Sequence, residues 1–158
     1  MLIGMPGSGK TTIGEALGAL SGRECIDTDA MVEAAAGMSI PEIFSRFGEE
    51  EFRRMEREAA VQAGHARGCV IMTGGGIVKD IRNLLPLSAN GRIYHIERDI
   101  EKLSRDGRPL SQGADLYKMY EQRRPMYERF RDAAVKNDTT PEDAAERIWR
   151  DFCENTCD

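Results

Sequence analysis

The glycine-rich segment at residues 4–12 constrains the fold of this chain more than any other stretch. It reads GMPGSGKTT and fits the pattern G-x-x-x-x-G-K followed by Ser or Thr. Its glycines let the backbone curl so that successive N–H groups point into one concavity, which an anion can occupy without meeting a side chain. The apolar Leu2 and Ile3 precede the loop, and IGEALGAL after it has helical apolar spacing. This strand–loop–helix order predicts an α/β fold with a phosphate site at the helix N-terminus.

The residue types in the loop predict a nucleotide and magnesium as ligands. Lys10 adds a mobile cation at the β- and γ-phosphates, and Thr11 offers a hydroxyl to Mg²⁺. The N-terminal dipole of the following helix also favours an anion. The alternative is a glycine turn that never meets a phosphate. The remaining residues that we expect to hold the nucleotide are those of the loop itself, Gly7, Ser8, Gly9 and Thr12.

The size and charge of the chain limit the classes of protein to which it can belong. Its 158 residues, 41% hydrophobic and 31% charged, fit one globular domain spanning residues 1–158. No apolar run approaches the length of about 18 residues that a membrane span needs, and the loop occupies the place of a signal peptide. We therefore expect a cytoplasmic protein that does not bind membranes. Separately, we expect a monomer. A net charge of −5 weighs against a nucleic-acid-binding surface, so anionic ligands must be held locally, by arginines such as those at 53–54, 105, 108 and 123–124.

Short apolar runs alternate with longer amphipathic ones, which is typical of a parallel sheet covered on both faces. Capping by Thr140, with Pro141 in the first turn, marks the start of the last helix. Residues 106–114, DGRPLSQGA, contain two glycines and a proline, and we interpret them as a lid. The first strand is short, so either a longer strand begins upstream or the protein keeps a clipped one. Expected strands cover 1–3, 24–27, 69–73, 91–96 and 132–136, and expected helices cover 10–20, 28–36, 40–47, 49–65, 79–86, 99–105, 115–131 and 141–153.

The four cysteines are interpreted as free thiols. Cys25 and Cys69 fall in strands predicted to be buried. Cys153 and Cys157 are four residues apart and could share a helix face, so a metal or redox pair is the alternative for them.

Two aspartates lie at the carboxyl end of the second predicted strand. Asp27 and Asp29, in the string CIDTDA, lie where open α/β sheets place their ligands. Residues two apart in an extended segment share a side, so both carboxylates could face one crevice. One would hold a magnesium-bound water and the other would accept a hydrogen bond from an acceptor hydroxyl. The alternative is that Asp29 caps a helix beginning near Ala30.

Two further segments carry candidate binding groups. Residues 73–76, TGGG, follow a strand directly, and glycines there destabilise the chain unless something approaches the backbone closely. We expect that to be a ligand, with a flexible surface turn as the alternative. In EEEFRRMEREAA, Arg53 and Glu56 are three residues apart on a helix face that could equally be solvated surface. The opposite stripe is apolar and consists of Phe52, Met55, Ala59 and Ala63.

The order GMPGSGKT, DTD, EEEFRRME, TGGG, GRPL and RRPMY resembles the shikimate kinases, and the resemblance covers nearly the whole chain. Many kinases share the phosphate loop, but the DTD pair, the FR-x-x-E helix and the TGGG turn in this order point to one family. The resemblance implies a three-layer P-loop kinase fold. It has a five-stranded parallel sheet with helices on both faces, a substrate-binding region at about 28–58 and a lid. It also implies ATP-dependent phosphorylation of the 3-hydroxyl of shikimate on the path to chorismate.

On the nucleotide side, the resemblance implies that Lys10 and the loop amides hold the phosphates. Thr11 would bind Mg²⁺ and Asp27 would lie near its waters. Arg108, in the lid, would close over the transferring phosphoryl group. Arg105 would flank the adenine together with the segment at Thr140-Pro141, although the stretch from Arg105 to Arg108 is shorter than is usual in this family.

On the substrate side, the resemblance implies that Asp29 contacts the acceptor hydroxyl, which makes Lys10, Asp29 and Arg108 the catalytic residues. Glu56 would orient Arg53. The groups that would contact the rest of the substrate are Arg53 and Arg123 at its carboxylate, and Gly75 and Gly76 at its ring hydroxyls. The alternatives are another small P-loop kinase, of the gluconate or nucleoside monophosphate type, or a non-catalytic nucleotide-binding module.

Overall fold

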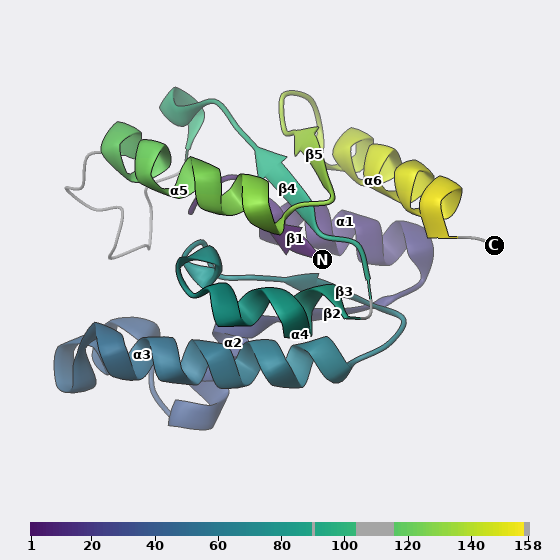
Figure 1. Cartoon of the computed structure of the whole chain (residues 1–158). Helices are drawn as coiled ribbons and strands as arrows, with labels where there is room; N and C mark the ends of the chain where they lie inside the picture. Colours follow the sequence, from purple (N-terminus) through teal and green to yellow (C-terminus); the bar gives the residue numbers. More distant parts are fainter. Residues whose placement is uncertain (90, 104–115, 157–158) are drawn as a thin grey trace.

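A parallel sheet forms the centre of the molecule in the computed structural model, which describes residues 1–89, 91–103 and 116–156 (Figure 1). Within these residues five strands pair in the order β2-β3-β1-β4-β5. All four pairings are parallel, and Leu2 of β1 pairs with Met72 on one side and Tyr94 on the other. The expected strands are confirmed, and their bounds are β1 Leu2–Ile3, β2 Glu24–Asp27, β3 Cys69–Met72, β4 Tyr94–Glu97 and β5 Ala133–Lys136.

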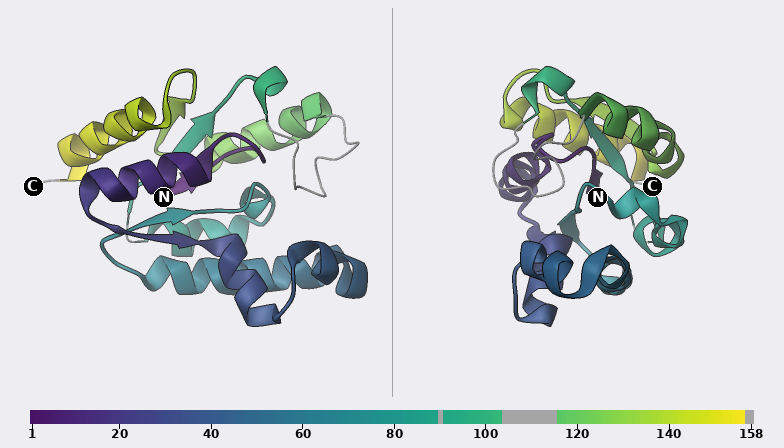
Figure 2. Two further views of the ribbon diagram at one scale, coloured as in Figure 1. Left: turned by 180° about the vertical axis from the view of Figure 1, so that it is seen from behind. Right: turned by 90° about the vertical axis from the view of Figure 1, so that its left-hand side faces the viewer.

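Helices cover both faces of this sheet, and Figure 2 shows α1 and α5 on opposite sides of it. One core joins β1, β3, β4 and β5 to α1 and α6, and a second joins β1 to α3, α4 and α5. The alternation of β4 follows these layers, because Tyr94 and Ile96 belong to the first core whereas His95 stacks on Tyr127 of α5. The helices are α1 Lys10–Ser21, α2 Thr28–Ala36, α3 Ile40–His65, α4 Leu84–Ser88, α5 Leu116–Phe130 and α6 Pro141–Thr156.

The long helix α3 is interrupted where the sequence predicts two helices. Gly48 has φ 81° and ψ 179°, outside the helical region, and thus separates residues 40–47 from residues 49–65. The predicted apolar stripe packs inward, with Phe52, Ala59 and Ala63 all buried. The predicted start of α6 is also confirmed, because Thr140 Oγ1 accepts a hydrogen bond from the Asp143 N–H at 3.1 Å.

Two helix predictions need correction. Residues 79–86 form no continuous helix; instead two 3₁₀ turns, η1 Ile77–Lys79 and η2 Ile81–Asn83, precede the short α4. Asp80 between the turns is extended, and its side chain accepts a hydrogen bond from the Arg82 N–H, which starts a new turn there. In the range 99–105 the described part holds only the 3₁₀ turn η3 Ile100–Lys102.

The expectation that Cys25 and Cys69 are buried is wrong. Cys25 is exposed and Cys69 is partly exposed, because β2 is an edge strand and β3 lies next to it. Among the residues that the structure describes, neither these cysteines nor Cys153 forms a disulfide; Cys157 lies outside those residues. Among the described residues no group of three or more His, Cys, Asp and Glu side chains is placed to bind a metal ion. In the same part of the chain, no helix combines the length and apolar character needed to cross a bilayer.

Candidate active site

The loop between β1 and α1 has the conformation that an anion-binding loop requires. Gly7 and Gly9 have φ values of 79° and 94°, which favour glycine. The ammonium of Lys10 is buried and donates to the carbonyl oxygens of Gly4 and Met5, both at 2.9 Å. Ser8 Oγ is buried and, among the described residues, has no hydrogen-bond partner. Since a buried hydroxyl is costly to leave unpaired, the loop fits a phosphate ligand that would pair with it.

A residue that we did not identify from the sequence forms a hydrogen bond with the phosphate loop. Asn137, directly after β5, donates from Nδ2 to the carbonyl oxygen of Ser8 at 2.8 Å. A Cβ on Gly9 would lie only 2.4 Å from this amide nitrogen, so Asn137 and Gly9 fit one another closely. Asn137 directly follows β5 and Asp27 is the last residue of β2, and this position at the carboxyl edge of the sheet is the signal that could have identified Asn137.

The phosphate loop and the TGGG turn lie side by side because β1 and β3 are neighbours. Thr73 donates from both its N–H and its Oγ1 to the Leu2 carbonyl oxygen, at 3.2 and 3.1 Å. After β1 the chain continues into α1 on one face of the sheet, whereas after β3 it continues into η1 on the other. Adjacent strands whose connections diverge in this way leave a crevice at their carboxyl ends, where open α/β sheets bind ligands.

A cavity of about 280 Å³ occupies this crevice. It brings together eight of the residues predicted to form the site, and these come from five separate segments of the sequence. Thr12 is exposed at the start of α1 and does not line the cavity. The predicted residues that line the cavity are Thr11, Asp27, Asp29, Arg53, Glu56, Gly75, Gly76 and Arg123.

Asp27 and Asp29 both line the cavity, but the backbone conformation that places them there differs from the one expected. Asp27 is the N-cap of α2, and its Oδ1 accepts from the N–H groups of Asp29 and Ala30 at 2.8 and 3.3 Å. Asp29 therefore lies in the first helical turn, so the argument from alternation in an extended segment is wrong. The alternative that Asp29 caps the helix is also wrong, because the helix begins at Thr28 and the capping residue is Asp27.

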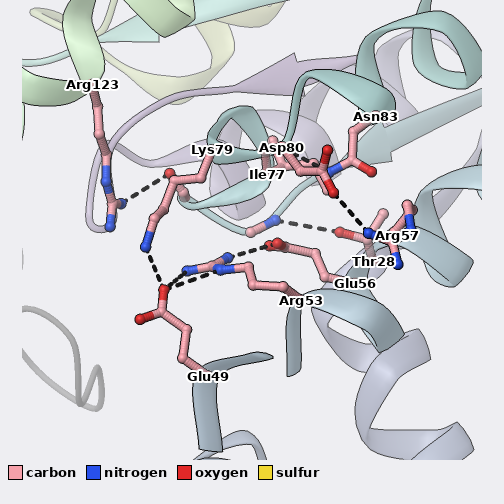
Figure 3. Close-up of polar contacts among 12 residues, drawn as sticks. Thr28, Glu49, Arg53, Glu56, Arg57, Ile77, Lys79, Asp80, Asn83 and Arg123 are labelled. Carbon is pink, nitrogen blue, oxygen red and sulfur yellow. Dashed lines mark hydrogen bonds and ion pairs between the residues drawn. The ribbon is translucent and has the colours of Figure 1, made fainter. Parts of the chain in front are cut away.

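Arg53 is held between two carboxylates, and Figure 3 shows this arrangement. Its Nη1 donates to Glu56 Oε2 at 2.6 Å, while Nε and Nη2 donate to Glu49 Oε1 at 3.3 and 3.2 Å. Glu56 is only 1% exposed, and burial raises the pKa of its carboxyl, a shift that the ion pair with Arg53 opposes. The neighbouring Arg54 points outward to Glu51 and Glu58, which are solvent-accessible. The helix thus has one solvated charged face and one that lines the cavity.

Each glycine of the TGGG turn lies so close to another part of the site that a Cβ atom would not fit between them. A Cβ on Gly74 would lie 2.4 Å from Asp29 Oδ1, and one on Gly76 would lie 2.4 Å from Arg53 Nη1. A Cβ on Gly75 would lie 2.6 Å from Cδ of Pro6 in the phosphate loop. We expected these glycines to make room for a ligand. The structure shows that they also make room for the side chains of the site itself.

The carbonyl oxygen of Gly75 receives two hydrogen bonds from α5. Arg123 Nη1 donates to it at 3.0 Å and the Tyr127 hydroxyl donates at 2.6 Å. Tyr127 is fully buried, and burial raises the pKa of its hydroxyl to about 12. Its ring stacks on His95 with centroids 4.6 Å apart, and burial lowers the pKa of His95 to about 4. Sequence reasoning gave Tyr127 no role; its spacing of four from Arg123 on one helix was the available signal.

A second cavity of about 450 Å³ opens at the carboxyl ends of β4 and β5. Asn137 is part of its wall, so this cavity and the phosphate loop share a residue. Further residues that line this cavity are Glu97, Arg98, Tyr120, Lys136 and Asp138.

Arg105, Arg108 and the expected lid at 106–114 lie outside the described residues.

Comparison with known proteins identifies the family. The family model described as shikimate kinase matches residues 6–153. A shikimate kinase of Caldanaerobacter subterraneus subsp. tengcongensis is 37% identical in an alignment of 162 residues. This alignment covers 96% of this chain and 94% of that protein. One of Synechococcus sp. strain RCC307 is 41% identical over 136 residues, covering 80% and 69%.

Solved structures agree with these relatives. Shikimate kinase from Acinetobacter baumannii in complex with shikimate has a TM-score of 0.91 at 29% identity, covering 99% of this chain and 93% of that one. The enzyme from Aquifex aeolicus has a TM-score of 0.85 at 30% identity, covering 99% and 96%. The expected P-loop kinase fold is confirmed, and no comparison favours the gluconate, nucleoside monophosphate or non-catalytic alternatives. The chain therefore belongs to the shikimate kinase family.

Proposed function

We propose that this protein transfers the γ-phosphoryl group of ATP to the 3-hydroxyl of shikimate in the 280 Å³ cavity, giving shikimate 3-phosphate and ADP. Membership of the shikimate kinase family supports this reaction. The observation that carries the proposal is the convergence of Arg53 from α3 and Arg123 from α5 on one cavity that the phosphate loop also borders. Two guanidinium groups in one pocket let an acidic protein bind an anionic substrate.

The substrate end of the cavity is assigned to the carboxylate and ring of shikimate. Arg53 and Arg123 bind the carboxylate, and the backbone of Gly75 and Gly76 contacts the ring hydroxyls. Glu56 holds Arg53 through the 2.6 Å contact to Nη1. Because the guanidinium is already oriented, less conformational entropy is lost when the substrate binds.

Asp29 is assigned to the acceptor hydroxyl. It lines the cavity beside Gly74, and its place in the first turn of α2 is fixed by the Asp27 cap. Phosphoryl transfer proceeds through a loose transition state, so catalysis depends mainly on alignment and on neutralising the equatorial oxygens. Asp29 accepts a hydrogen bond from the hydroxyl and directs its oxygen toward the phosphoryl group, while Lys10 provides positive charge at the phosphates.

The phosphate loop, from Gly7 to Thr12, is assigned to the phosphates of ATP, and Thr11 and Asp27 to Mg²⁺. Both of these residues line the cavity, and Asp27 uses Oδ1 for capping, so its other carboxylate oxygen can accept from a metal-bound water. When bound, Mg²⁺ neutralises charge on the β- and γ-phosphates. The 450 Å³ cavity, next to Asn137, is assigned to the nucleoside.

Two arginines outside the described residues complete the proposal. Arg108 closes over the transferring phosphoryl group and Arg105 flanks the adenine together with Thr140-Pro141. Closure of the 106–114 segment would exclude water and so limit hydrolysis of ATP. All assigned groups belong to one chain, and we propose that the protein acts as a monomer in the cytoplasm.

A coupled assay of ADP release with MgATP and shikimate tests the reaction. Turnover with gluconate or a nucleoside monophosphate, and none with shikimate, would contradict it. Arg53→Ala should mainly raise the KM for shikimate, whereas Asp29→Asn should mainly lower kcat with the ATP affinity kept. Equal losses of ATP affinity in both variants would show that the two residues do not have the assigned roles.

A further inference from the structure

An ion pair that the proposed function does not use connects the TGGG turn to the substrate helix. Lys79 is the last residue of η1, and its ammonium contacts Oε1 of Glu49, the first residue of α3 after the break at Gly48 (Figure 3). The same oxygen accepts hydrogen bonds from Arg53, at 3.3 Å from Nε and 3.2 Å from Nη2. One carboxylate oxygen is therefore shared between Lys79 and the guanidinium assigned to the substrate carboxylate.

Within the ion-pair cluster of Arg53, positive and negative charges balance only when Lys79 is included. Arg53 forms ion pairs with Glu49 and Glu56, so one positive charge faces two negative charges and the sum is −1. The ion pair between Lys79 and Glu49 adds a positive charge and brings the sum to zero. A group with a net negative charge beside the carboxylate pocket would repel an anionic substrate. Lys79 offsets this negative charge, although it does not itself line the cavity.

The geometry also restricts the position of Arg53. Glu49 holds its Nε and Nη2 side, Glu56 holds Nη1 from the buried side, and Gly76 lies against the guanidinium. Lys79 fixes Glu49 to the segment that follows Gly76, so the turn and the arginine are tied to each other. Lys79 is 38% exposed and Glu49 is 49% exposed, and ion pairs this accessible contribute little to global stability. The ion pair should therefore matter more for substrate binding than for folding.

We propose that Lys79 is a positioning residue for the anionic substrate, which acts by neutralising and anchoring Glu49 so that Arg53 presents its remaining donors to the substrate carboxylate. This role rests on the proposed function. The plainer interpretation is a surface salt bridge without functional consequence, and the two make different predictions.

Lys79→Met should raise the KM for shikimate about threefold to tenfold, the range expected when one partly solvated charge is lost near an anionic ligand. The effect should shrink at high ionic strength, while kcat, the KM for ATP and the melting temperature stay close to wild type. Lys79→Arg should restore most of the affinity. Arg82→Met is the matched control, because it removes a positive charge from the same segment, but the partner of Arg82 is Asp80, which contacts Arg57 and not Arg53.

A double variant separates charge balance from simple bridging. If Lys79 acts by neutralising Glu49, then Glu49→Gln combined with Lys79→Met should bind shikimate better than Lys79→Met alone. The proposed role of Lys79 would be overturned by any of three results. Lys79→Met could leave the KM for shikimate unchanged, it could raise this KM only as much as Arg82→Met does, or the double variant could bind shikimate no better than Lys79→Met alone. If the wild-type protein failed to bind shikimate in calorimetry, the proposed function itself would fail. Normal wild-type binding with an unaffected Lys79→Met would refute only the role of Lys79.

Discussion

Gly76→Ala tests the substrate pocket, because it adds one methyl group directly beside the side chain of Arg53. The added Cβ would lie 2.4 Å from Nη1, 2.7 Å from Nη2 and 2.9 Å from Cζ of Arg53. Gly76 has φ −99° and ψ 0°, a conformation that alanine can adopt. The backbone therefore has no need to change, and the guanidinium at the end of a flexible side chain must move instead. A shift of about 1 Å restores an ordinary contact distance.

The magnitude follows from the contacts that this shift disturbs. Arg53 is assigned to the substrate carboxylate, and a charge-assisted hydrogen bond contributes about 1.5–3 kcal/mol. Its loss would raise the KM for shikimate about 10- to 150-fold. Stability should change much less. Replacing glycine stabilises the folded protein by about 0.4–1 kcal/mol, because it reduces the conformational entropy of the unfolded chain. This gain offsets part of the cost of disturbing the 2.6 Å contact between Arg53 and Glu56. We expect the melting temperature to stay within about 4 °C of wild type.

The coupled ADP-release assay gives KM for shikimate and for ATP, and thermal denaturation gives stability. Gly91→Ala is the control, because a Cβ there would meet none of the described residues within 4 Å. A Gly76→Ala protein with a wild-type KM for shikimate would refute the placement of Arg53 against this turn. A melting temperature lowered by more than about 10 °C, together with equal losses for both substrates, would show that the turn is needed for folding and that the steric argument is wrong.

Two further predictions concern the layer beneath the turn. Tyr127→Phe removes the 2.6 Å hydrogen bond to Gly75, but Arg123 still donates to that carbonyl, so we expect a loss of about 0.5–1.5 kcal/mol, or roughly 1–6 °C in melting temperature. Because the backbone of Gly75 is assigned to the ring hydroxyls of shikimate, the calorimetric affinity for shikimate should fall while that for ADP holds, and a fall in the ADP affinity alone would contradict this expectation. Burial lowers the pKa of His95 from 6.5 to about 4, so between these values the unfolded chain binds a proton that the folded protein excludes, and stability falls as the pH drops. Denaturant unfolding should show this contribution as about 2 kcal/mol lost between pH 7.5 and pH 5, and His95→Phe should lose correspondingly less over that interval; an identical pH dependence would exclude His95 as the cause.

Much of the site could be predicted because its signals are local in the sequence. The phosphate loop needs glycines, a lysine and a hydroxyl within nine residues, and apolar runs on either side indicate the strand and helix that frame it. Asp27, Asp29 and the TGGG turn follow predicted strands, and parallel strands end at one edge of the sheet. The roles of Arg53 and Arg123, by contrast, came from a family resemblance, because a charged helix face alone does not distinguish a pocket wall from solvated surface.

Only the tertiary structure decided which groups touch. The sequence by itself determined the order of the strands and helices, through the periodicity of apolar residues, and the phosphate loop, through its residue types. It did not determine that β2 is an edge strand with an exposed Cys25, that the glycines of the turn yield space to Asp29 and Arg53, or that Lys79 neutralises Glu49, thirty residues away. The physical reason is that backbone conformation follows mainly from neighbouring residues, whereas contacts, burial and charge balance depend on which distant segments the sheet order brings together.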